Sequence, residues 1–369
     1  MCIIIGKCLK RGLDFMHVIE KKKSSLSNWI NVVVDNNTTN FWLQKLNPLW
    51  SVDQALGQIV QKEQIAHDIV SLKIQINKNF VAAQAGQHHP IVIEINGIRY
   101  ERTYSLTQVD AQHVLLTAKK VDQGKVSSYL LEKAQVGDVI EFGQPYGEMT
   151  LPQQQKLIFL AAGSGITPMY SLIQELVKTG ELKNRQVDLL YWVKTAEDCA
   201  FKTQFDQIAQ QYPQLKLHYF FTQAESAQPR LNEQHLTLLN DIEHSAVFAC
   251  GPSGFVQTVE QLFAHAQLIQ TEAFSMSPVL LDDQGSVQIT LTQSGKVVEI
   301  PKGQSILQAL EQQNIKPTFG CRMGICNKCV CNKVEGSTQN LLNGSQNHEP
   351  GNILKLCINS AKTDLTLDL

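Results

Sequence analysis

The chain has 369 residues, a formal net charge of −2 and 18% charged residues. Its length predicts two or three domains, and its nearly balanced charge gives no electrostatic reason to expect a nucleic-acid partner. Nine cysteines without an apparent export signal indicate a reducing compartment and predict a cytoplasmic protein. The sequence contains no run of 18 apolar residues, so no transmembrane helix is expected.

Residues 1–54 form a lead segment that has two interpretations. It combines basic residues with large aromatic residues, at Lys21–Lys23, Trp29, Phe41, Trp42 and Trp50. The simpler interpretation, which we favour, is a segment that packs on the following domain. The alternative is a helix that rests on a membrane or on a partner protein, which would make the protein peripheral at the inner face of the membrane.

Residues 55–154 show the pattern of a small antiparallel β-barrel. Short apolar stretches recur at regular intervals, with Gly and Pro between them. The expected strands are residues 69–74, 91–95, 114–118 and 139–142. Asn96 and Gly97 are typical of a two-residue hairpin turn.

Residues 155–272 alternate between buried strands and helices, which predicts a parallel sheet with crossover helices. The expected strands are residues 157–161, 187–192, 215–220 and 246–250. Helices are expected over 169–178, ending near Gly180, and over 254–266. Residues 271–285 have the composition of a linker, and we place the linker itself at 273–285.

The last segment, residues 286–369, opens with two expected strands and a helix. The strands are residues 287–291 and 297–300, and the helix lies near 306–313. Cys331 falls in an alternating stretch, so we expect it to be a buried strand residue.

Arg102, Thr103, Tyr104 and Ser105 close an expected barrel strand. They offer a cation for a phosphate, a flat apolar wall for a ring and a hydroxyl group for polar ring atoms, which are the parts that a flavin needs. Arg and Tyr also alternate on ordinary strands, so this tetrapeptide alone does not decide its role.

Gly124, Lys125, Val126 and Ser127 form a glycine-led segment with backbone N–H groups and a hydroxyl group. Such a segment suits a pyrophosphate at the start of a helix. An ordinary turn with a helix cap has the same composition.

Gly163, Gly165 and Thr167 lie between an expected strand and an expected helix, where backbone N–H groups and the helix dipole attract a dinucleotide phosphate. The third glycine of the Rossmann fingerprint is missing, so a tight connection without a ligand remains an alternative.

Cys250, Gly251 and Pro252 end another expected strand, on the side where open α/β sheets bind ligands. Cys250 by itself also fits a small buried apolar residue.

Four cysteines carry the strongest signal in the sequence. Cys321, Cys326 and Cys329 follow the spacing C-x4-C-x2-C, and Cys357 lies further on. This spacing is typical of a plant-type [2Fe–2S] cluster, and Gly324 suits the irregular loop. A structural zinc site prefers paired C-x2-C motifs or Cys with His, and disulfides need an oxidising compartment, so we favour the cluster.

Taken in order, these motifs resemble known electron-transfer modules. Residues 55–272 are similar to the ferredoxin–NADP reductase family, and residues 286–369 resemble a plant-type ferredoxin domain with its Cys-Arg-x-Gly-x-Cys-x-x-Cys loop. The resemblance implies a multidomain fold with an antiparallel β-barrel flavin domain, an α/β parallel-sheet nucleotide domain and an α+β (β-grasp) ferredoxin domain.

The resemblance also implies roles for individual residues. The flavin would be held by Arg102, Tyr104 and Ser105, and its phosphates by Gly124, Lys125, Val126 and Ser127. The pyridine nucleotide would contact Gly163, Gly165, Thr167, Cys250, Gly251 and Pro252, and Phe274 would approach the flavin. The cluster would be bound by Cys321, Cys326, Cys329 and Cys357.

A hydride carries two electrons, whereas an iron–sulfur cluster accepts one, so a flavin must stand between them. The expected path therefore runs from NAD(P)H through FAD to the [2Fe–2S] cluster and then to an external redox protein, and no side chain is needed as acid or base. We favour FAD over FMN because the segment at Gly124 offers room for a pyrophosphate. NADPH is favoured over NADH mainly by the resemblance, since the cations Lys194 and Lys202, beside Thr195, are opposed by Glu197 and Asp198.

The acceptor is expected to be a desaturase or an oxygenase. The chain looks closest to bacterial reductase partners of membrane acyl-CoA desaturases, with Leu46–Trp50 and the Gly86-Gln87-His88 stretch in support. The alternatives are the reductase of a soluble ring-hydroxylating oxygenase and a redox-inert binding or sensor module. His88 and His89 point to opposite faces of a strand, so we expect them to form barrel wall rather than a metal site.

Overall fold

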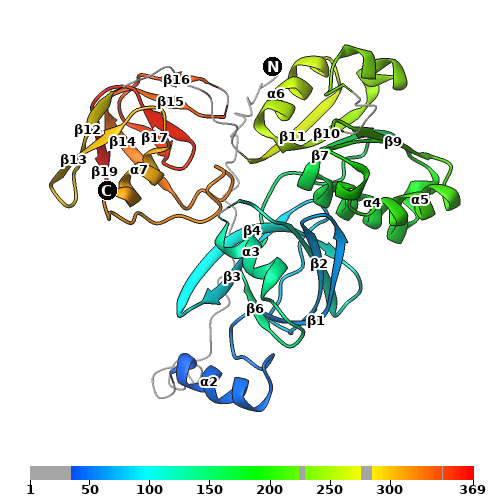
Figure 1. Cartoon of the computed structure of the whole chain (residues 1–369), viewed down its shortest axis with the longest axis horizontal. Helices are drawn as coiled ribbons and strands as arrows, with labels where there is room; N and C mark the ends of the chain where they lie inside the picture. The colour runs from blue at the N-terminus through cyan, green and yellow to red at the C-terminus, as the bar shows by residue number, and fades with distance from the viewer. Residues whose placement is uncertain (1–34, 123, 224–228, 276–284, 343) are drawn as a thin grey trace, which may run out of the picture.

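The computed structural model describes residues 35–122, 124–223, 229–275, 285–342 and 344–369. Three folded units follow one another along the chain, and a short helix precedes them (Figure 1). They are a closed antiparallel barrel, a parallel sheet with helices and a smaller unit of two sheets, so the predicted fold class is confirmed. Among these residues, no helix combines the length and the apolar character that are needed to cross a bilayer.

Helix α2 (Asn36–Leu46) begins at Asp35, whose carboxylate accepts hydrogen bonds from two backbone N–H groups of the first turn. The segment that follows is tied to the barrel because Asn77 donates hydrogen bonds to the carbonyl groups of Leu49 and Gln54, at 3.1 and 2.9 Å. Residues 1–34 of the expected lead segment lie outside the described residues.

The barrel closes in the order β1-β2-β5-β4-β3-β6. Its strands are β1 (Leu56–Ala66), β2 (Ile69–Ile76), β3 (His88–Ile95), β4 (Ile98–Gln108), β5 (His113–Lys119) and β6 (Val139–Phe142). Positive φ angles at Asn96 and Gly97 confirm the predicted turn between β3 and β4. Helix α3 (Lys125–Glu132) covers one end of the barrel through Val126 and Leu130, which are buried.

The nucleotide unit is a five-stranded parallel sheet in the order β11-β10-β7-β8-β9. Its strands are β7 (Lys156–Ala162), β8 (Gln186–Val193), β9 (Leu215–Phe221), β10 (Ala246–Pro252) and β11 (Leu268–Ser275). The longer helices are α4 (Ile166–Thr179), α5 (Lys202–Gln211) and α6 (Ser253–Leu262), and the short 3-10 helices are η1 (Gly163–Gly165), η2 (Glu181–Lys183), η3 (Ala196–Asp198), η4 (Glu233–Leu238) and η5 (Ile242–His244). Helix α4 ends at Gly180, as predicted, with φ at 76°.

Strand β11 corrects one expectation about this unit. Residues 271–275, which have the composition of a linker and of which we placed 273–275 in it, form the end of β11 and pair in parallel with β10. Strand β11 lies at the edge of the sheet and carries polar side chains between apolar ones, so composition does not distinguish it from a connection. The domain boundaries themselves stay a prediction.

The last unit, called the cluster unit below after its predicted ligands, consists of two sheets of short strands and one helix (Figure 1). Its larger sheet has the order β13-β12-β19-β14-β17 and its smaller sheet has the order β16-β15-β18. The elements are β12 (Ser286–Leu291), β13 (Lys296–Pro301), α7 (Ile306–Gln312), β14 (Val330–Glu335), β15 (Thr338–Asn340), β16 (Gln346–Asn347), β17 (Asn352–Lys355), β18 (Asn359–Ala361) and β19 (Leu365–Asp368). Cys331 is buried on β14, as predicted.

Gly165 is packed against the neighbouring strand so closely that no side chain fits. A Cβ atom on Gly165 would lie 1.9 Å from the carbonyl oxygen of Cys250 and 2.8 Å from the nitrogen of Gly251. Both atoms belong to the backbone of β10 and cannot move independently of the sheet. The glycine is therefore required for the approach of η1 to β10, whatever ligand binds nearby.

The substitution Gly165→Ala is expected to destabilise the nucleotide unit by about 1–3 kcal/mol, because the added methyl group must displace strand backbone. Native-state hydrogen exchange of the β10 amide groups would measure this loss in that unit alone. Ser164→Ala is the matched control, since it adds no atom to the contact. Unchanged exchange in Gly165→Ala would contradict the packing role.

Candidate functional site

The four cluster cysteines come together as two pairs. The sulfur atoms of Cys329 and Cys357 are 3.1 Å apart, and the backbone N–H of Cys321 donates to the sulfur of Cys326 at 3.2 Å. Cys321, Cys329 and Cys357 are buried, while Cys326 is half-buried. Two thiol pairs fit a centre in which each of two iron atoms takes two thiolates.

The loop that carries these cysteines favours a thiolate at Cys321, whereas the hydrogen bond between the two sulfur groups raises the pKa of Cys326. Backbone N–H groups of Met323 and Cys326 point at the sulfur of Cys321, at 3.4 and 3.3 Å. The hydrogen bond with Cys326, supported by these N–H groups, lowers the pKa of Cys321 to about 6. Gly324 holds a φ of 79° that an ordinary side chain resists.

The geometry argues against the zinc alternative. A structural zinc site needs four ligands around one centre, whereas the cysteines here form two separate pairs. The donor set therefore fits the [2Fe–2S] cluster.

A cavity of about 330 Å³ lies where the barrel, the nucleotide unit and the cluster loop meet. It brings together the residues that we predicted for the flavin, which are Arg102, Tyr104, Ser105, Gly124, Lys125, Val126, Ser127 and Phe274. Thr167, which we predicted to contact the pyridine nucleotide, lines this cavity as well. Burial raises the pKa of Tyr104, so its hydroxyl group stays protonated.

Four cations line this cavity: Arg102, Lys119, Lys125 and Arg322. Arg322 forms an ion pair with Glu311, whereas the other three form none with a carboxylate among the residues that the structure describes. Arg102 donates to the backbone carbonyl of Glu101 at 2.7 Å, and burial, followed by the nearby charge of Arg322, lowers its pKa. Helix α3 begins at Lys125, and no side chain caps its first N–H groups. Free cations beside uncapped N–H groups suit a diphosphate.

A buried polar chain links the cavity to the nucleotide unit. The Nδ1 atom of His88 lies 2.9 Å from the hydroxyl of Ser105, and its Nε2 atom lies 2.6 Å from a carboxylate oxygen of Glu272 on β11. His88 is 1% exposed and lines the cavity together with Ser105. The expectation that His88 is only barrel wall is therefore incomplete, because its ring fixes the Ser105 hydroxyl. His89 does point away, with its Nε2 atom 2.9 Å from the carbonyl of Val81.

A second cavity, of about 580 Å³, lies at the carboxyl ends of β7, β8 and β10. Gly163 and Pro252 line it, as predicted, and so do the cations Lys194 and Arg230. Neither cation is within ion-pair distance of a carboxylate in the described ranges. Ligands of open α/β sheets bind at this edge.

Several predicted nucleotide residues lie behind this cavity rather than in its wall. Gly165, Cys250 and Gly251 are buried where η1 meets β10. Burial, and then the charge of Glu272, raises the pKa of the Cys250 thiol well above its ordinary value.

Of the residues that we weighed for or against binding a 2′-phosphate, Lys194 and Asp198 line the second cavity and Lys202 does not. Lys202 forms an ion pair with Asp206 at 2.6 Å and does not line the cavity. Asp198 lines the cavity, but its carboxylate accepts hydrogen bonds from the backbone and the hydroxyl of Thr195, both at 3.1 Å.

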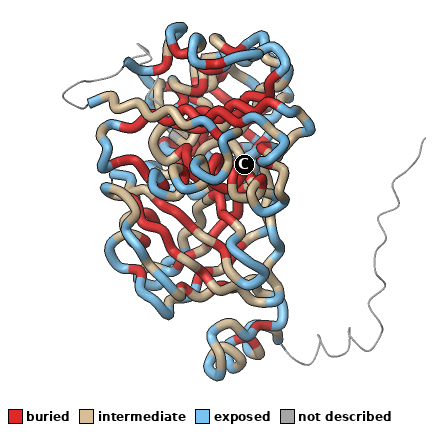
Figure 2. The backbone as a smooth tube through the Cα atoms, turned by 90° about the vertical axis from the view of Figure 1, so that its right-hand side faces the viewer, coloured by how far each residue is buried: buried red, intermediate tan, exposed pale blue. Residues whose placement is uncertain are grey.

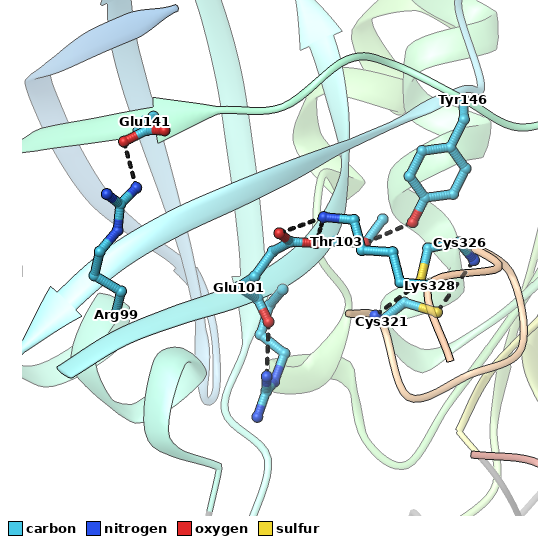
Figure 3. A network of polar contacts seen from close by, with 9 residues as sticks. Arg99, Glu101, Thr103, Glu141, Tyr146, Cys321, Cys326 and Lys328 are labelled. Carbon is cyan, nitrogen blue, oxygen red and sulfur yellow. Dashed lines mark hydrogen bonds and ion pairs between the residues drawn. The ribbon is translucent and has the colours of Figure 1, made fainter. Parts of the chain in front are cut away.

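The cluster loop forms one wall of the first cavity, through Cys321, Arg322, Met323 and Ile325. Figure 3 shows how this loop is held against the barrel. The ammonium group of Lys328 contacts both carboxylate oxygens of Glu101 on β4, at 2.5 and 2.6 Å. A predicted cluster ligand, Cys321, and the predicted flavin residues thus face the same space.

Three residues around the cavities were missed by the sequence reasoning, which are Lys119, Arg230 and Glu272, and so was the contact of His88 with Ser105. Lys119 ends a strand that was predicted, so its position at the strand end was an available signal. Arg230 and Glu272 carry no local pattern that separates them from surface residues.

Three family models match the chain in order. They are the oxidoreductase FAD-binding domain over residues 56–151, the oxidoreductase NAD-binding domain over 159–261 and the 2Fe-2S iron-sulfur cluster binding domain over 289–358.

Two relatives match over most of their length. An NADPH oxidoreductase of Mycobacterium tuberculosis is 30% identical over 89% of this chain and 88% of its own. Phthalate dioxygenase reductase of Burkholderia cepacia is 27% identical over 85% and 96%. A solved structure of phthalate dioxygenase reductase, described as a modular structure for electron transfer from pyridine nucleotides to [2Fe–2S], matches with a TM-score of 0.62 at 25% identity and covers 86% and 98% of the two chains.

The order of the three domains and the 30% identity with a relative over nearly the whole of both chains agree with the geometry of the two cavities and the thiol pairs. The chain belongs to the ferredoxin reductase-type oxidoreductases with a C-terminal [2Fe–2S] domain, in which electrons pass from NAD(P)H through FAD to the cluster.

Proposed function

We propose that the protein takes a hydride from NADPH and delivers single electrons to a separate redox protein. The observation that carries this proposal is that Cys321, a cluster ligand, lines the same cavity as Arg102 and Tyr104. FAD supplies a centre that accepts a hydride and releases its electrons one at a time. The chain itself binds, orients and shields the cofactors.

In the first cavity, we assign the phosphates of FAD to Arg102, Lys119 and Lys125 with the first N–H groups of α3. These groups are cationic or uncapped, and they line one continuous space. Tyr104 would form a flat wall for the ring. The hydroxyl of Ser105 would face the polar ring atoms, held in one orientation by the ring of His88.

In the second cavity, we assign the 2′-phosphate of NADPH to Lys194 and Arg230. Both cations line the cavity without a carboxylate partner among the described residues, and Thr222 adds a hydroxyl group. The relative from Mycobacterium tuberculosis is named an NADPH oxidoreductase, which supports the same choice.

The acceptor is proposed to be an oxygen-dependent enzyme in a separate chain. Relatives named phthalate dioxygenase reductase and glycine betaine monooxygenase reductase subunit favour an oxygenase. The exposed aromatic residues of α2 favour a membrane enzyme instead, as expected for an acyl-CoA desaturase. Membranes stripped of peripheral proteins, supplied with this protein and NADPH, would regain acyl-CoA desaturation in the second case only.

The substitution Cys329→Ser is expected to leave reduction of the bound flavin by NADPH intact and to abolish cluster-dependent reduction of cytochrome c, because one iron loses a ligand. Rapid-mixing absorbance would follow flavin and cluster separately. Cys331→Ser is the matched control, since Cys331 is a buried cysteine two residues away outside the ligand set. Survival of both cluster absorbance and cytochrome c reduction in Cys329→Ser would refute the ligand assignment.

Arg230→Ala is expected to raise KM for NADPH by about tenfold to a hundredfold, because a charge-assisted contact with the 2′-phosphate is worth about 1.5–3 kcal/mol. KM for NADH, which lacks that phosphate, should stay unchanged. Steady-state kinetics with ferricyanide as acceptor measures both. An equal rise in KM for the two nucleotides would show that Arg230 does not contact the 2′-phosphate.

Glu101→Gln is expected to slow electron transfer from flavin to cluster by about twofold to fivefold, since it removes a partly exposed ion pair that holds the cluster loop. The transfer should also lose most of its dependence on salt. Glu141→Gln is the control, because Glu141 pairs with Arg99 at 2.6 Å elsewhere on the barrel (Figure 3). The swap Glu101→Lys with Lys328→Glu should restore the rate, and a swap that stays slow would count against the contact.

A further inference from the structure

Helix α2 packs on its surroundings through polar side chains, which reverses the usual arrangement. Asn40 is only 3% exposed; it donates a hydrogen bond to Asp53 at 2.8 Å and accepts hydrogen bonds from Ser51 and the backbone of Val52. Gln44 donates to Gln54 at 2.8 Å on the same side of the helix. A helix of a water-soluble protein normally turns its apolar face inward and its polar face outward.

Large apolar side chains lie on the exposed side of α2. Phe41, Trp42 and Leu46 are 54%, 65% and 77% exposed; Trp42 and Leu46 lie one helical turn apart, and the ring of Phe41 contacts that of Trp42. Trp50 and Val52, in the segment that follows, are 52% and 49% exposed. Single exposed apolar residues are common, but five large ones within twelve residues form a patch of the kind that marks an interaction surface.

The patch has the composition of the interface between lipid and water. Phe41 and Trp42 make an edge-to-face contact with ring centroids 5.4 Å apart, and the ammonium group of Lys45 lies 5.3 Å from the centre of the Phe41 ring. Aromatic rings with a lysine at their border can insert among lipid acyl chains while the ammonium group reaches the headgroups.

The charge of the N-terminal segment favours a membrane, rather than an apolar protein surface, as the partner of this patch. Residues 1–50 contain seven Lys or Arg against three Asp or Glu, although the whole chain has 32 against 34. Three of the four tryptophans, Trp29, Trp42 and Trp50, also lie in these fifty residues. A basic, tryptophan-rich segment on an otherwise acidic protein matches an anionic bilayer.

The position of the patch leaves the electron path free. Helix α2 stands at the end of the barrel that lies away from the nucleotide unit and the cluster unit (Figure 1), and it projects from the body of the molecule (Figure 2). We propose that the patch formed by Phe41, Trp42, Leu46, Trp50 and Val52 docks the protein on an anionic membrane surface, with both cavities still open. This inference does not depend on the identity of the acceptor.

The test is co-sedimentation of the full chain with vesicles of phosphatidylcholine alone and of phosphatidylcholine with phosphatidylglycerol. We expect binding to the anionic vesicles, weakened by salt, and a loss of about tenfold or more in the double variant Phe41→Ser with Trp42→Ser. Ile353→Gln, which removes a 76% exposed apolar side chain from the cluster unit, is the matched control and should bind as the unchanged protein does.

Reduction of ferricyanide by NADPH should be the same in all three proteins, which separates this inference from the proposed function. Equal vesicle binding by the double variant and the unchanged protein would overturn the docking role of the patch. So would a failure of the unchanged protein to bind either kind of vesicle. A dimer that the double variant abolishes would show that a second copy covers the patch. Vesicle binding that appears only after removal of residues 1–34 would show that this segment covers it. Either result would overturn the proposal.

Discussion

Two cofactors exchange electrons quickly only if they lie close together, and this constraint accounts for the placement of the cluster loop. The loop has no regular secondary structure, yet it is fixed from two sides. Arg322 forms a bidentate ion pair with Glu311 of its own unit, and Lys328 reaches Glu101 on the barrel. On either side of Arg322, Cys321 and Met323 form a wall of the cavity that we assign to the flavin. The distance between the cofactors is therefore set by side chains of two domains.

The same cavity depends on the nucleotide unit. The ring of His88 fixes the orientation of the Ser105 hydroxyl, and Glu272 on β11 in turn holds that ring. Ser171 of α4 also donates a hydrogen bond to the carbonyl of Leu106, next to Ser105, at 3.0 Å. Both contacts are buried, where a lost partner costs more than at the surface. The barrel and the nucleotide unit are therefore fixed relative to each other by buried contacts. The cluster unit is held by the partly exposed ion pair between Lys328 and Glu101 and by a hydrogen bond from Gln257 of α6 to the carbonyl of Leu342.

Motifs formed by residues that are adjacent in the sequence could be located from the sequence alone. The cysteine spacing, the Arg102–Ser105 stretch and the Gly163–Thr167 connection are local, so their positions follow once the strands are found. Sequence reasoning failed where distant segments meet: Lys119, Arg230 and Glu272 reach the cavities only through strand order. At Gly165 and Cys250, the motif that suggested ligand contact also serves close packing of backbone, so the glycine is required there whether or not a ligand binds. Edge strand β11 was missed because half-exposed strands lack a clear apolar pattern.

Lys119 has a consequence for how the two cavities influence each other. Its side chain borders both of them, and no carboxylate in the described part of the chain neutralises it. An anion that binds on one side therefore changes the electrostatic potential felt on the other. Coupling between two binding equilibria is reciprocal. If a bound dinucleotide lowers the affinity of the first cavity for the flavin phosphates, the bound flavin must lower the affinity of the second cavity for the dinucleotide by the same factor. One unpaired lysine at the end of a strand makes occupancy of either cavity a regulator of its neighbour.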